Sequence, residues 1–246
     1  RDAVVPRTGV AEALARMRGA APVGVVTGSG MELERLPDTV EAEVPFAGVP
    51  GMPGAHVAGH GGKFLRGTHG GRPLFMQCGR IHLYEGYSPA EVARGVDVMA
   101  GWGAETIIFL NAVGGLQPGL KPGDLVACDE VWAWPFLRHA FPPVQRPDLI
   151  LPGCDHTGPC MWMHGPCYET RAEVDLLRRS GAAVVGMSLV SELVRCRELG
   201  VRSAVVCCVA NLCGGAEPLS HTHVLENMHA AAARIRNCIS GALPAL

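Results

Sequence analysis

The chain has 246 residues, of which 48% are hydrophobic and 18% charged, and its formal net charge is −2. This length fits one large α/β domain or two small ones, and the near-neutral charge does not indicate a nucleic-acid or membrane surface. No apolar stretch approaches the roughly 20 residues of a membrane-spanning helix, and residues 1–6 do not have the pattern of a signal peptide.

Short apolar, β-branched runs alternate with helical patterns along the chain, which predicts an α/β fold with helices flanking a mainly parallel or mixed central sheet. Two of the predicted helices begin with a capping box, at Ser88 with Glu91 and at Thr170 with Glu173. The predicted strands are 23–27, 74–77, 106–110, 124–128, 161–164, 183–187 and 203–209, and the predicted helices are 10–18, 89–102, 171–180, 191–199 and 222–239.

The stretch 132–154 is rich in proline and aromatic residues and has little periodicity. It indicates an irregular excursion from the fold rather than a linker between domains. We therefore expect a single domain that spans residues 1–246.

Polar side chains gather directly after the apolar residues 73–76. Arg80, His82 and Tyr84 are two positions apart, so an extended backbone would project them to the same face. A fixed cation, an imidazole and a phenol hydroxyl on one face suit an anion that lies beside a polyol, such as phosphate next to a sugar.

Other polar or small residues follow predicted strands, where ligands bind in open α/β sheets. Gly28-Ser29-Gly30 offers N–H groups and a hydroxyl to an anion, although such a turn is more often only a flexible connection. It is neither a Walker loop nor a dinucleotide fingerprint, so no nucleotide cofactor is indicated. The segment 111–115 and the side chains Glu169, Asn211 and His221 each have an ordinary structural explanation, but together they indicate a site.

The ten cysteines follow no framework spacing, and several lie in apolar runs such as 205–209, as buried reduced thiols do in a cytoplasmic protein. One Cys/His-rich stretch raises the question of zinc, but its spacing lacks the Cys-x₂₋₄-Cys pairs of structural zinc sites. Zinc is therefore a minor alternative, and its candidate ligands are Cys154, His156, Cys160, His164 and Cys167.

Taken in order, these segments resemble the trimeric purine nucleoside phosphorylases, a family related to the methylthioadenosine phosphorylases. The long block 79–87 is the most specific of them. The resemblance implies a mixed sheet with a small barrel-like distortion, surrounded by helices, and a homotrimer (with a hexamer as the alternative) whose sites lie near subunit contacts. The matching segments are 28–30, 59–62, 79–87, 111–115, 165–170, 186–188 and Asn211.

The resemblance also implies phosphorolysis, in which a purine nucleoside and phosphate give free base and ribose 1-phosphate without a metal or another cofactor. By match to family positions, the residues expected to hold phosphate are Ser29, Arg80, His82, Ser188 and the backbone N–H of Ala112, with His60 over the entrance. Ribose is expected to contact Tyr84, Met187 and His221. The purine is expected to contact Tyr168, Glu169 and Asn211. Of these, the expected catalytic residues are Asn211, Glu169 and His82.

The choice of nucleoside is less closely determined. Asn211 can donate to O6 or N7, and residues 211–213 contain no acid, which favours 6-oxopurines. Ala210 and Leu212 replace a threonine and a lysine of many relatives, so a 5′-modified nucleoside such as methylthioinosine is an alternative substrate. The excursion 132–159 is shorter than in relatives, and the sequence does not show which of its aromatic residues completes a neighbouring ribose pocket: Trp132, Trp134, Phe136, His139 or Phe141.

Two rival classes are a hydrolytic nucleosidase and a non-catalytic purine-binding relative. The anion-binding set argues against the first, because a nucleosidase needs no phosphate site. The presence of Glu169 and Asn211 beside that set argues against the second.

Overall fold

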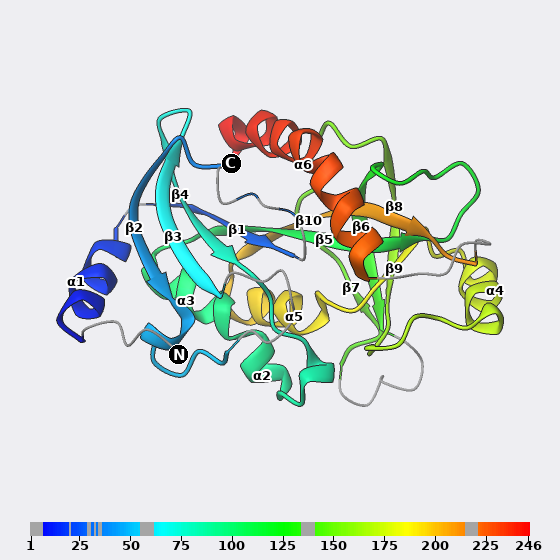
Figure 1. Cartoon of the computed structure of the whole chain (residues 1–246), viewed down its shortest axis with the longest axis horizontal. Helices are drawn as coiled ribbons and strands as arrows, with labels where there is room; N and C mark the ends of the chain where they lie inside the picture. The colour runs from blue at the N-terminus through cyan, green and yellow to red at the C-terminus, as the bar shows by residue number, and fades with distance from the viewer. Residues whose placement is uncertain are drawn as a thin grey trace.

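The computed structural model describes residues 7–19, 21–28, 31, 33, 36–54, 62–133, 141–214 and 221–246, with the backbone alone at residues 7–11 and 221. Their strands form a mixed sheet with helices on both sides (Figure 1), as the sequence predicts. No helix in this described part is long and apolar enough to span a bilayer. The helices are α1 (Arg7–Met17), α2 (Pro89–Val92), α3 (Arg94–Trp102), α4 (Arg171–Ser180), α5 (Val190–Leu199) and α6 (His221–Ala242).

Five strands close into a small barrel, which confirms the expected distortion of the sheet. They are β5 (Thr106–Gly115), β6 (Leu125–Ala133), β8 (His156–Trp162), β9 (Val184–Gly186) and β10 (Arg202–Leu212). Their pairing runs β10–β6–β8–β9–β5, and β5 then pairs with β10 in parallel. The ring of hydrogen bonds is thereby complete.

The sheet continues beyond the barrel from the other edge of β5. There β1 (Val23–Thr27) and β4 (Arg72–Cys78) are parallel, and β3 (Lys63–His69) and β2 (Thr39–Pro45) follow as an antiparallel meander. The strands β2, β3 and the short β7 (Val144–Gln145) were not among the predicted strands. In β2 and β3, exposed or partly exposed residues interrupt the buried ones, so neither strand has a continuous apolar run.

The central strands are buried on both faces, and each face contacts different helices. Ile107 and Phe109 belong to a core cluster with side chains of α3 and α5, whereas Ile108 and Leu110 belong to one with side chains of α6. Figure 1 shows α6 on one side of the sheet and α3 and α5 on the other. This double burial explains why the strands are apolar at successive positions.

Several predicted boundaries were wrong. β5 and β10 continue through Gly115 and Leu212, so residues 111–115 and Asn211 lie within strands rather than in loops after them. Closure of the barrel keeps both strands paired past their polar residues. β8 begins earlier than predicted, at His156, and the predicted helix 89–102 is divided at Ala93 into α2 and α3.

Both predicted capping boxes are confirmed. The Ser88 hydroxyl accepts a bond from the backbone N–H of Glu91, and the Glu91 carboxylate accepts one from the backbone N–H of Ser88. Thr170 and Glu173 make the same reciprocal pair at the start of α4. These bonds satisfy N–H groups that have no partner within the helix.

We expect Gly67→Ala in β3 to destabilise the open end of the sheet. A Cβ at Gly67 would lie 2.1 Å from the backbone oxygen of Thr39, which cannot move without separating β2 from β3. The free energy of unfolding, measured by urea titration, should fall by about 2–4 kcal/mol. The control is Gly101→Ala in α3, where a Cβ meets nothing within 4 Å and helix propensity favours alanine. Equal losses in the two variants would contradict this explanation.

Candidate active site

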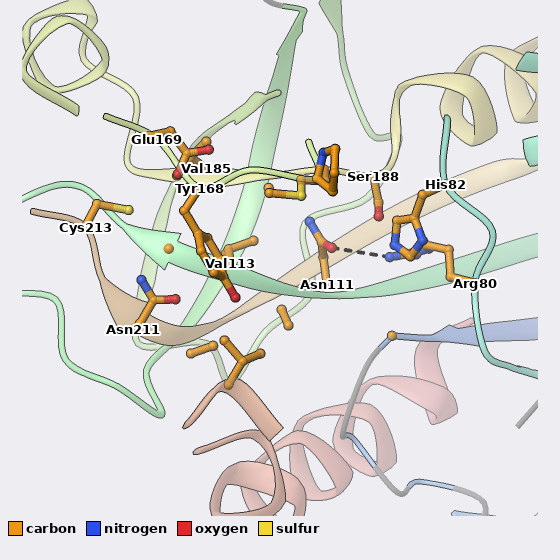
Figure 2. A pocket seen from close by; sticks show the side chains of 18 of the residues that line it. Arg80, His82, Asn111, Val113, Tyr168, Glu169, Val185, Ser188, Asn211 and Cys213 are labelled. Atoms are coloured by element: carbon orange, nitrogen blue, oxygen red, sulfur yellow. Dashed lines mark hydrogen bonds between the residues drawn. The ribbon is translucent and has the colours of Figure 1, made fainter. Parts of the chain in front are cut away.

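An elongated cavity of about 310 Å³ lies where the ends of several strands meet. Its walls come from β5, β9, β10 and the segments that follow β1, β4 and β8, with one residue from α6, Val224. Figure 2 shows two polar ends: Arg80, His82 and Ser188 lie at one, and Glu169, Asn211 and Cys213 at the other.

Arg80 is the buried cation of the first end, with 1% of its surface exposed. Its Nη1 donates to the carbonyl of Leu110 at 3.1 Å and to Oδ1 of Asn111 at 3.3 Å, and its Nε lies 3.2 Å from Oε1 of Glu192. Burial lowers the Arg80 pKa, and the charge of Glu192 opposes that effect. Because an arginine pKa is normally far above 7, the guanidinium stays charged.

His82 lies near this cation in the same cavity but is itself neutral. Burial, and secondarily the charge of Arg80, lowers its pKa to about 3. Its Nδ1 lies 3.0 Å from Oε1 of Glu85, which also accepts the backbone N–H of His82. A carboxylate can only accept, so we assign the proton to Nδ1, and the contact is a hydrogen bond rather than an ion pair. Nε2 is then an acceptor, suited to a P–OH group.

Tyr84 lines the same cavity, but the backbone before it differs from the predicted one. The extended backbone expected from Arg80 to Tyr84 was wrong, because Leu83–Glu85 forms a 3₁₀ turn. The Glu85 carboxylate accepts a hydrogen bond from the backbone N–H of His82, and this bond accompanies the bend of the chain. The Tyr84 ring nevertheless stacks on His82, with centroids 4.7 Å apart, and both rings line the cavity. Burial raises the Tyr84 pKa to about 12, so its hydroxyl remains protonated.

Met187 and Ser188 follow β9 and line the cavity, with Ser188 at the same end as Arg80 and His82 (Figure 2). The next residue, Leu189, has φ +97°, the only positive φ of a non-glycine residue in the part of the chain described. Its N–H donates to Oε2 of Glu192 at 3.0 Å. A positive φ in a branched residue is strained and persists only where the surroundings hold it.

The second polar end combines two hydrogen-bonding side chains with apolar walls. Burial raises the pKa of Glu169, and Asn211 lies in β10 just after a bulge that follows Val209. Gly114 faces them: a Cβ there would be 2.4 Å from Sγ of Cys213 and 3.5 Å from Nδ2 of Asn211. The missing side chain of this glycine therefore lets Cys213 and Asn211 pack close to β5.

The structure brings together most of the predicted site residues. Ser29 and His60 lie outside the described residues, and so does the side chain of His221, which begins α6. The predicted residues that line the cavity are Arg80, His82, Tyr84, Ala112, Tyr168, Glu169, Met187, Ser188 and Asn211.

The aromatic residues of the excursion are only partly described. Phe141 is buried, and its ring packs edge-on against Trp162 at 5.3 Å, so within this chain it belongs to the core. Trp132 lies in β6 and donates from its indole to Glu130. Trp134, Phe136 and His139 lie outside the described residues.

Sequence reasoning missed some of the residues that shape the site. Val113, Val185 and Cys213 line the second polar end of the cavity. Glu192 does not line the cavity but forms an ion pair with Arg80. Glu192 carried a signal that was not used: it is a carboxylate in an apolar stretch, four residues after Ser188.

The cysteines and histidines of the zinc alternative do not converge. Cys154 lies beside Cys238 of α6, Cys160 is buried in the barrel and Cys167 is exposed. Over the residues that the structure describes, no group of three or more His, Cys, Asp or Glu side chains is arranged to hold a metal ion.

The neutral state of His82 can be tested by the pH dependence of stability. In the unfolded chain His82 takes up a proton near pH 6.5, whereas in the folded chain it does so only near pH 3. Below pH 6.5 the unfolded state therefore binds more protons than the folded state. As the pH is lowered, the free energy of unfolding of the wild type should fall relative to that of His82→Gln by up to about 1.4 kcal/mol per pH unit. Urea titrations of both proteins between pH 7 and 5, without phosphate, measure this. A difference independent of pH would mean that His82 is not held neutral.

The sequence is similar to those of known proteins. The family model described as the phosphorylase superfamily matches residues 22–152 and 155–244. Purine nucleoside phosphorylase 1 of Geobacillus stearothermophilus is 30% identical over 231 residues, covering 83% of this chain and 84% of that protein. The purine nucleoside phosphorylase of Mycobacterium tuberculosis is 33% identical over 254 residues, covering 94% and 89%.

Solved structures show the same fold. The purine nucleoside phosphorylase of Schistosoma mansoni in complex with inosine superposes with a TM-score of 0.76 at 26% identity, covering 98% of each chain. Isoform 2 from the same organism, in complex with cytosine and ribose-1-phosphate, gives 0.77 at 27% identity, covering 96% of this chain and 95% of that one. The chain belongs to the phosphorylase superfamily and, within it, to the purine nucleoside phosphorylases.

Proposed function

We propose that this protein catalyses the reversible phosphorolysis of purine nucleosides to free base and ribose 1-phosphate. The observation that carries the proposal is one cavity with an anion-binding end (Arg80, His82 and Ser188) and a base-binding end (Glu169 and Asn211). Solved relatives that share the fold were obtained with inosine and with hypoxanthine, which supports the same ligand class.

The reaction forms a bond between a phosphate oxygen and C1′ of the ribose as the bond from C1′ to N9 breaks. The bonding electron pair leaves with the purine, while positive charge develops on the sugar. Phosphate held by Arg80 stabilises that charge and attacks from close range. Tyr84 and Met187 line the same cavity, and the ribose would lie against them.

The base end provides for the departing purine. Asn211 donates to N7 or O6 and stabilises the negative charge that develops there. The Glu169 carboxylate accepts the N1–H of a 6-oxopurine, whereas an ionised carboxylate meets only the lone pair of N1 in a 6-aminopurine. Hypoxanthine- and guanine-type bases are the preferred leaving groups, and a 5′-modified nucleoside such as methylthioinosine is the alternative substrate.

The proposal extends to the state of the protein. It acts as a single domain and a homotrimer in the cytoplasm, with phosphate as co-substrate and no other cofactor. Free cysteines in the described part, most of them buried, support a reducing compartment. Light scattering of the purified protein measures the number of subunits.

Turnover of inosine with and without phosphate tests the proposed reaction. We expect phosphate-dependent release of hypoxanthine, faster turnover of inosine and guanosine than of adenosine, and a 5′-methylthio analogue series that defines tolerance at the ribose end. Cleavage without phosphate would identify a nucleosidase. Inosine binding without any turnover would identify a purine-binding protein.

We expect Asn211→Ala to lower kcat for inosine by about 100- to 1,000-fold, because its amide acts on charge that develops only in the transition state. The KM for inosine should change by less than about threefold. The control is Asn237→Ala, an exposed position of α6. Steady-state kinetics at saturating phosphate measure both constants, and equal losses in kcat and affinity would contradict the leaving-group role.

A further inference from the structure

A buried ion pair lies directly behind the anion end of the cavity. Arg80 lines the cavity, whereas Glu192 on α5 does not. Only 4% of the surface of Glu192 is exposed. Burial raises the pKa of Glu192, while Arg80, the N–H of Leu189 and its own N–H oppose that rise. A buried ion pair often adds little to the stability of a fold. The position of this pair beside the cavity therefore points to a role in the site.

The two oxygens of Glu192 contact two different segments of the anion end. Oε1 lies 3.2 Å from Nε of Arg80, which follows β4. Oε2 accepts the N–H of Leu189 at 3.0 Å, in the segment after β9. One carboxylate therefore joins two parts of the chain that are far apart in sequence.

Each contact restricts a residue of the anion end. Together with the bonds of Nη1 to Leu110 and Asn111, the Nε contact restricts the guanidinium plane of Arg80. The second contact holds Leu189 at its strained φ of +97°, next to Ser188. Figure 2 shows Ser188 and Arg80 at the same end of the cavity.

We propose that Glu192 is a positioning residue that sets Arg80 and Ser188 as one phosphate-binding unit. This inference rests on the proposed function, because it takes the occupant of this end to be the phosphate co-substrate. Glu192 does not touch phosphate: it acts through the two residues that do. The negative charge of Glu192 repels an anion. If Glu192 acted by charge alone, it would therefore weaken phosphate binding, whereas a positioning role strengthens it.

Glu192→Gln separates these roles, because an amide is uncharged and has one oxygen, so it cannot place a negative oxygen beside Arg80 and also accept the N–H of Leu189. We expect the KM for phosphate to rise by about 10- to 100-fold, because the Arg80 guanidinium loses the charged partner that restricts it, and the KM for inosine to stay within about twofold. The matched control is Glu198→Gln on the same helix, where the carboxylate is exposed and pairs with Arg195. That variant should behave as wild type.

Two further variants keep the inference testable. Ser188→Ala should raise the KM for phosphate in the wild type but add little in the Glu192→Gln background, because the two residues act as a unit. Glu192→Asp keeps the charge and both acceptor oxygens but is one methylene shorter, so it should give an intermediate KM for phosphate. If Glu192→Gln does not fold, Glu192→Asp decides: a phosphate KM equal to wild type would overturn the inference.

The outcomes distinguish this inference from the function on which it rests. Phosphate-dependent turnover by wild type and Glu198→Gln, with an unchanged or lowered phosphate KM in Glu192→Gln, overturns the positioning role alone. Equal increases in the KM values for phosphate and inosine would show a general loss of structure and also overturn it. Absence of phosphorolysis in the wild type rejects the proposed function. Calorimetric titration with inorganic phosphate then tests Glu192 directly, and equal affinity in wild type and Glu192→Gln overturns the positioning role.

Discussion

The parallel pairing of β5 with β10 is the interaction on which the rest of the site depends. It closes the barrel, and its register is set by residues buried along most of both strands. A single bulge between Val209 and Asn211 brings Asn211 opposite Gly114, where the missing side chain lets Cys213 and Asn211 pack close to β5 beside the cavity. The position of the Asn211 amide in the cavity is therefore a consequence of core packing. A shift in this register would move the two polar ends of the cavity relative to each other.

The anion end is organised around a cation that has been removed from water. A buried charge without compensation costs several kcal/mol, and here Glu192 and the carbonyl of Leu110 compensate Arg80 on the inner side. At low effective dielectric the same guanidinium attracts an anion more strongly than an exposed arginine would. The neighbouring imidazole of His82 is kept neutral, so the described residues at this end supply one fixed cation instead of two. Selectivity for phosphate then depends on hydrogen-bond geometry as well as on charge.

Local signals were enough to predict some elements with their bounds. β1 is a run of buried residues and α4 begins at a capping box, and the sequence predicts Val23–Thr27 and Arg171–Ser180 as observed. Asn111 and Asn211 have the polarity of strand ends, but barrel closure buries or pairs them within longer strands, which no local pattern contains. The face shared by Arg80 and Tyr84 was predicted, but the backbone between them was not, because a side chain three residues on bends it. The Glu192 contact to Arg80 joins distant segments, so only the folded chain shows it. The predicted roles of Ser29, His60 and His221 remain predictions.

The charge distribution of the cavity bears on which nucleophile it can use. Hydrolysis would require a base near C1′ to take a proton from water, and the described residues at the anion end offer a cation, a hydroxyl and an imidazole whose pKa is about 3. Such an imidazole is a poor proton acceptor in catalysis near pH 7. Phosphate needs no such base, because it is already an anion at neutral pH and its remaining proton can be donated to Nε2 of His82 in a hydrogen bond. The low pKa of His82 therefore suits a nucleophile that arrives ionised, and among the described residues of this site it favours phosphorolysis over hydrolysis.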